Sequence, residues 1–140
     1  MPELIKARPG TMRLLDARHY RLPAAGWVSI LHRVSGALMI FLLPFIVWLF
    51  DTSVSSEVSY DRFSNAFVAG IGFAPGWFVK LVVWALIWAY LLHFIAGVRH
   101  LWMDITHSVA LAQGRSSALF TLVSSAVLTV LLGAKLFGLY

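Results

Sequence analysis

Long uncharged stretches alternate with short polar ones along the chain, and this pattern predicts three membrane-spanning helices. We place them at about residues 23–50, 76–98 and 117–139. Each is long enough for an α-helix to cross about 30 Å of hydrocarbon. Residues 51–76 are rich in Ser and Gly and are predicted to form a loop, in which the stretch 60–68 is compatible with a short surface helix.

The composition supports an all-α integral membrane protein that forms one anchor domain over residues 1–140. Hydrophobic residues make up 60% of the chain and charged residues 12%, and the mean hydropathy is +0.82. These values lie far from those of a soluble globular domain. There is no cysteine. Histidine is therefore the only strong ligand that the chain offers to a transition metal.

The positive charges lie at the ends of the apolar runs and indicate how the chain is oriented. Five of the Lys and Arg residues fall within residues 1–22, which we interpret as a basic arm at the membrane surface. Because Lys and Arg collect on the cytoplasmic side, we expect the N-terminus inside and the C-terminus outside. The formal charge of +5 fits contacts with lipid headgroups and gives no reason to invoke nucleic acid. Glu3 and Asp16 in the short arm argue against a mitochondrial transit sequence and favour a bacterial inner membrane.

One histidine, His93, lies inside the second apolar run, in a row with Ala85, Ala89 and Gly97 at intervals of four residues. Polar side chains are costly in hydrocarbon, and those present usually face a bundle interior and mark a functional site. The small neighbours predict a shallow groove in which a flat cofactor such as haem could bind the imidazole. Alternatively, the row is a helix-packing seam and His93 only forms a hydrogen bond across it.

A second polar group begins the first predicted span. Ser29, His32, Arg33 and Gly36 share one helical face, with Arg33 at the membrane boundary. Arg33 could be a simple snorkelling anchor, but the hydroxyl and imidazole beside it favour a polar pocket. With the predicted orientation, this group, His93 and His100 all lie near the inner membrane surface. We therefore expect them to meet in one site.

The third predicted span carries a ridge of small residues every four positions: Ser117, Thr121, Ser125, Thr129 and Gly133. Such ridges let a second helix approach closely. Three spans alone bury little surface, so we expect a partner membrane subunit to cover this ridge.

Two motifs carry a resemblance to a known family: SILHRVSG from Ser29 to Gly36, and HxxxGxRHLxxD from His93 to Asp104. In this order, on the first and second of three spans, they resemble the cytochrome b556 membrane-anchor subunit of succinate dehydrogenase. The resemblance implies that His93 is an axial ligand of haem b and that Ser29 and Arg33 form a ubiquinone site. Candidate contacts to the haem propionates or pocket are His32, Arg33, Arg99 and His100.

The resemblance also implies the partners, namely a second membrane-anchor subunit that supplies the other axial histidine, an iron-sulfur subunit and a flavoprotein subunit. The chain would thus contribute to the quinone site of a succinate:quinone oxidoreductase without carrying the dehydrogenase chemistry itself. Two alternatives stay open. One is the anchor of a fumarate reductase, and the other is a cofactor-free membrane adaptor in which every histidine is structural.

Overall fold

The computed structural model describes residues 20–108 and 110–140, which form five helices and no strand. The helices are α2 (Ala24–Phe41), α3 (Leu43–Val54), α4 (Glu57–Val68), α5 (Gly76–Thr106) and α6 (Leu111–Leu136). The basic arm predicted for residues 1–22 lies almost entirely outside the described part. Three of the helices, α2, α5 and α6, are long and apolar enough to cross a membrane. The all-α membrane fold with three spans is therefore confirmed.

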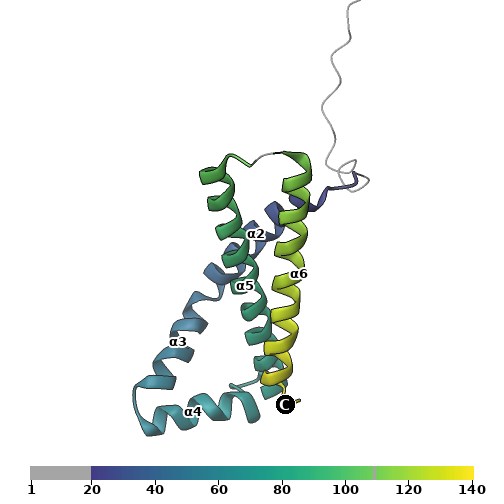
Figure 1. Ribbon diagram of the computed structural model, residues 1–140. Coiled ribbons are helices and arrows are strands. Elements are labelled where there is room, and N and C mark those ends of the chain that lie inside the picture. The colour runs from purple at the N-terminus through teal and green to yellow at the C-terminus, as the bar shows by residue number, and fades with distance from the viewer. Residues whose placement is uncertain (1–19, 109) are drawn as a thin grey trace, which may run out of the picture.

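The first span is not one continuous helix, as residues 23–50 predict, because α2 ends at Phe41 and α3 begins at Leu43. Pro44 explains the break. Proline lacks an N–H and its ring collides with the carbonyl four residues earlier, which is that of Ile40. Leu42 between the helices has φ −92° and ψ 4°, outside the helical range. In Figure 1, α3 continues past the break and leans away from α5.

A surface helix closes the far end of the molecule. The stretch 60–68, predicted as compatible with a short surface helix, falls within α4, which starts at Glu57 behind a capping box of Ser56 and Ser59. Figure 1 shows α4 running across the molecule and leading back to the start of α5. The turn between them needs glycine at Gly70, where φ is 104° and a Cβ would overlap the backbone of Ala74 and Pro75.

The second and third spans are helical over different ranges from those predicted. Helix α5 continues to Thr106 instead of ending near residue 98, so Arg99, His100 and Asp104 are helical residues. It ends at His107, which takes the left-handed conformation with φ 53°. Helix α6 runs from Leu111 to Leu136 rather than from 117 to 139. The polar side chains of the second motif are therefore held on a rigid element.

The small-residue ridge is packed inside the chain. Thr121, Ser125, Thr129 and Gly133 are buried on α6, where the indole Nε1 of Trp84 from α5 donates to the carbonyl of Thr129 at 3.0 Å. The ridge does allow a close helix approach, as predicted, but the expectation that a partner subunit covers it is wrong. Helix α5 covers it because a connection of only four residues keeps α5 beside α6.

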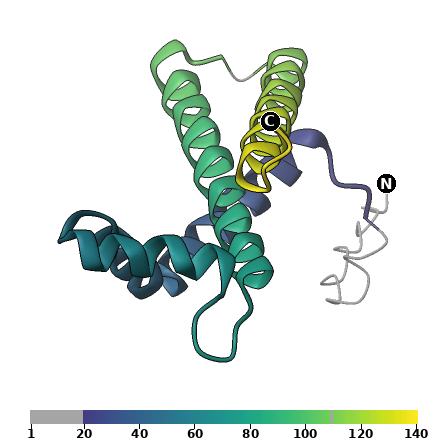
Figure 2. The ribbon, with the colours of Figure 1, turned by 90° about the horizontal axis from the view of Figure 1, so that it is seen from below.

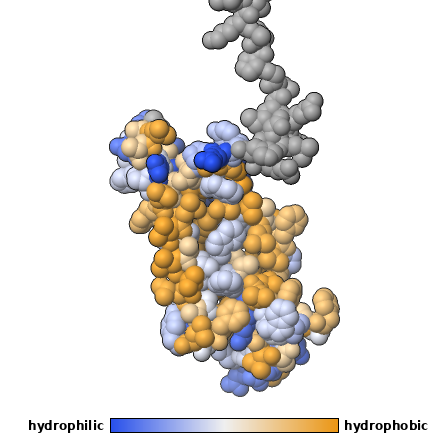
Figure 3. Space-filling view, turned by 90° about the vertical axis from the view of Figure 1, so that its right-hand side faces the viewer, coloured by the Kyte–Doolittle hydropathy of each residue, from blue (hydrophilic) through white to orange (hydrophobic). Residues whose placement is uncertain are grey.

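Apolar side chains cover much of the middle of the molecule, while hydrophilic ones gather at its two ends (Figure 3). Many large apolar side chains of the spans are exposed in the single chain, among them Phe94, Val123 and Val130. The ends of the described chain lie apart: its first residues lie toward the end of the molecule that carries the α5–α6 connection, and the C-terminus lies at the opposite end (Figure 1). This distribution is what a lipid environment and neighbouring membrane helices require.

Candidate functional site

His93 is half-buried on α5 and is fixed by the backbone of α2. Its Nδ1 lies 3.0 Å from the carbonyl oxygen of His32 and 3.3 Å from Oγ of Ser35. A carbonyl can only accept, so we assign the proton of the neutral ring to Nδ1. The lone pair then resides on Nε2, on the other side of the ring from the His32 carbonyl.

Three imidazoles meet between α2 and α5. The rings of His32 and His93 are stacked with centroids 4.0 Å apart, and the edge of His100 approaches His32 at 5.3 Å. Nε2 of His32 is buried and has no hydrogen-bond partner among the described residues. An unpaired buried nitrogen is costly. The cluster is thus more polar than helix packing alone would require.

Gly36 allows this close approach, because a Cβ there would lie 3.0 Å from Cε1 of His93. A Cβ on Gly97 would lie 3.8 Å from Nε2 of His32, which is an ordinary contact. The shallow groove predicted beside His93 is therefore filled by α2 along the Gly97 side. Helix α2 thus packs against this side of the row, and a cofactor would have to reach His93 from the Nε2 side.

Ser29 and Arg33 lie on α2 near the imidazoles but do not join them. Ser29 is half-buried and Arg33 is exposed. Neither forms a side-chain hydrogen bond within the described part of the chain. The predicted meeting of five polar residues is thus realised for His32, His93 and His100, while Ser29 and Arg33, one turn away or less along α2, have no side-chain partner among the described residues.

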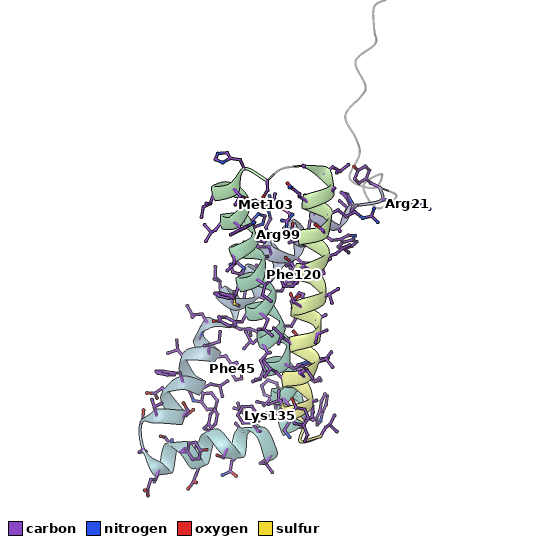
Figure 4. The ribbon with its side chains drawn as sticks, in the orientation of Figure 1. Arg21, Phe45, Arg99, Met103, Phe120 and Lys135 are labelled. Atoms are coloured by element: carbon purple, nitrogen blue, oxygen red, sulfur yellow. The ribbon has the colours of Figure 1, made fainter. Side chains whose placement is uncertain are left out.

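Arg99 points toward α6 instead of toward the imidazoles. Its Nε donates to Oγ of Ser117 at 3.0 Å and its Nη2 to the carbonyl of Gly114 at 3.2 Å. Figure 4 places its side chain between α5 and α6. The guanidinium of Arg99 is therefore directed at α6 and away from the imidazoles beside which a propionate contact was predicted.

Sequence reasoning missed Ser35, which is fully buried and supports His93. Its Oγ also donates to the carbonyl of His32 at 2.8 Å. The available signal was its spacing, because Ser35 follows His32 by three residues and so lies on the same helical face.

Comparisons with known proteins assign the chain to a family. The family model described as succinate dehydrogenase/fumarate reductase transmembrane subunit matches residues 8–132. The chain belongs to this family. The name of the family covers both enzymes, so membership leaves the direction of the reaction open.

Curated relatives share most of their length with the chain. The succinate dehydrogenase cytochrome b556 subunit of Coxiella burnetii is 32% identical over 119 residues, which are 85% of this chain and 90% of the relative. The subunit of the same name from Paracoccus denitrificans is 29% identical over 80% of this chain and 81% of its own. The one from Rickettsia felis is 26% identical over 81% and 82%. The match to the family model covers both motifs and most of the three apolar helices.

Proposed function

We propose that the chain is the cytochrome b556 membrane-anchor subunit of a succinate dehydrogenase. It would bind haem b together with a second anchor subunit and form part of a ubiquinone site. Electrons would reach this site from the iron-sulfur subunit, which is itself reduced by the flavoprotein. The observation that supports this best is the contact of His93 Nδ1 with the His32 carbonyl at 3.0 Å. A backbone acceptor of this kind is the usual support of a metal-ligating histidine.

The residues around His93 fit a haem group. Nε2 of His93 has no hydrogen-bond partner in the described chain, and the ring is half-buried, so the nitrogen can be reached from outside α2. When bound, haem would store and release one electron through its iron. His93 would supply one ligand to the haem iron, and the second anchor subunit would supply the other.

Polar side chains next to His93 are suited to the haem carboxylates. His32 and His100 contribute imidazoles from two different helices. Arg33 follows His32 on α2 and carries an exposed guanidinium, which can bind a carboxylate through paired hydrogen bonds. We assign these three residues to the propionates or the pocket wall.

Ser29 and Arg33 are assigned to the quinone site. A quinone carbonyl gains negative charge as it is reduced, and an oriented hydroxyl and a fixed positive charge stabilise that charge. Both groups lie on the half of α2 that also carries His32, so they are close to the predicted haem site. The same end of the bundle carries Arg21, Arg99 and Arg115, which supports a location at the inner face of a bacterial inner membrane.

Replacement of His93 by Ala tests the haem assignment. Ala keeps the helix and its insertion favourable. The purified complex should therefore assemble but lose most of its low-spin haem absorbance, whereas His107→Asn, at the exposed end of α5, should leave the spectrum unchanged. An unaltered spectrum at full haem occupancy in His93→Ala would refute the assignment, and a wild-type complex without haem absorbance would favour the cofactor-free adaptor.

A smaller change beside His93 should perturb the same spectrum. A Cβ at Gly36 would press on Cε1 of His93 at 3.0 Å, so Gly36→Ala should displace the ring and lower haem occupancy or shift its absorbance. Gly97→Ala is the matched control, because its Cβ would make only an ordinary contact at 3.8 Å. Equal spectra in both variants would show that the ring position does not matter for haem.

The choice between succinate dehydrogenase and fumarate reductase rests on the names of the relatives. Rates of succinate oxidation and fumarate reduction by the same purified complex, with matched quinone and quinol, separate the two. Faster fumarate reduction would favour the alternative.

A further inference from the structure

Arg99 is a buried cation that has no carboxylate partner among the described residues. It is 8% exposed, and no described Asp or Glu lies within ion-pair distance of it. Within the described part of the chain, two hydrogen bonds hold its guanidinium, to Ser117 and Gly114, and further N–H donors have no partner there. A buried charge normally requires compensation by an opposite charge.

Arg99 lines a cavity of about 620 Å³ between the first turns of α2, the last turns of α5 and the start of α6. Arg115 lines the same cavity, so two arginine residues border one space. The remaining walls are mostly apolar and include Pro23, Met103 and Leu119. The helices α5 and α6 separate toward their connection in both Figure 1 and Figure 2, at the end where the cavity lies.

The two arginine residues lie near one end of the spans. Arg99 lies seven residues before the end of α5 at Thr106, which corresponds to about 10 Å along the helix axis. Arg115 lies within the first two turns of α6. Figure 4 shows Arg99 at the end of the molecule that also carries Arg21. The end of a span is where the headgroup region of a bilayer is expected.

We propose that this cavity binds an anionic phospholipid, with its phosphate between Arg99 and Arg115 and its acyl chains along the apolar walls. Arginine is well suited to bidentate recognition of phosphate oxygens. Residues 1–19 of the chain itself are a less suitable occupant of the cavity, because they carry four Lys or Arg and only two Glu or Asp. Two cations favour a negatively charged headgroup over a segment with a positive excess.

The test measures bound lipid and not enzyme activity, so it is independent of the proposed function. The complete complex is reconstituted into nanodiscs of mixed phosphatidylglycerol and phosphatidylcholine, re-extracted in detergent, and its retained lipid is quantified by mass spectrometry. We expect phosphatidylglycerol to be enriched. Arg115→Gln and Arg99→Gln should each lower the enrichment about fivefold, and Arg62→Gln, an exposed cation on α4 at the other end, should not change it.

Arg115→Gln keeps the test decisive if Arg99→Gln fails to assemble, because Arg115 is exposed and forms no hydrogen bond to the rest of the described chain. Unchanged enrichment in Arg115→Gln would overturn the proposal, as would equal retention of both lipids by the wild type. If phosphatidylglycerol is retained only by a variant that lacks residues 1–19, and not by the wild type, that segment occupies the cavity. If inorganic phosphate stabilises the complex in detergent against heat as much as phosphatidylglycerol does, the site binds free phosphate.

Discussion

Replacing Ser29 by Ala or Arg33 by Leu should lower quinone reduction by the assembled complex about a hundredfold. Loss of one oriented donor to a developing oxyanion commonly raises the barrier by about 3 kcal/mol. The two side chains have no hydrogen-bond partner in the described chain, and Arg33 is exposed on α2, so both are available to a ligand. Succinate oxidation with a soluble dye, which takes electrons before they reach the membrane, should stay nearly unchanged.

The comparison of the two electron acceptors separates catalysis from assembly. Arg62→Leu removes an exposed arginine on α4, at the opposite end of the bundle, and should affect neither activity. If quinone and dye reduction fall together in the Ser29 and Arg33 variants, these residues serve assembly and Arg33 is only an anchor. If neither activity falls, the quinone binds elsewhere.

The second large effect is expected on α6. A Cβ at Gly133 would overlap Nε1 of Trp84 and lie 2.8 Å from its Cδ1, so Gly133→Ala has to displace the indole and weaken its hydrogen bond to Thr129. Gly133→Leu adds more volume to the same buried contact, and overpacking of this kind typically costs about 1–3 kcal/mol. Both variants should lower the thermal unfolding temperature of the complex, Leu more than Ala, and Ser125→Leu should act in the same direction.

Gly114→Ala provides the control within the same helix. Its Cβ would meet nothing within 4 Å, and Ala is favoured over Gly inside a helix by up to about 1 kcal/mol. The two glycine substitutions should therefore change stability in opposite directions. A Gly133→Leu complex with normal yield and unfolding temperature would show that the contact between Trp84 and Gly133 does not stabilise the α5–α6 pair.

Several features could be predicted from particular residues without the structure. Hydropathy located the three spans because the bilayer penalises charged side chains and unpaired backbone groups along the whole length of a span. Helical spacing placed His32 and Gly36 on one face of the first span, and His93 and Gly97 on one face of the second span. In the structure these four residues do meet. Pro44 was visible in the sequence, and its missing N–H could have predicted the break between α2 and α3.

The tertiary structure alone decided which partner each polar or small side chain received. The ridge from Thr121 to Gly133 defines a face suited to close packing, but periodicity does not identify the helix that covers it, and the short connection brings α5 there. Arg99 lies in the recognised motif, yet its guanidinium binds Ser117 and Gly114 on α6 instead of facing the imidazoles. The spacing of residues along one helix fixes their direction relative to each other, whereas the contacts they make depend on how neighbouring helices cross.

For this protein the sequence by itself determined the spans, the family and the residue types of the site. The packing of α2 against α5 decided that His93 is held through Nδ1, because only that crossing brings the His32 carbonyl to its ring.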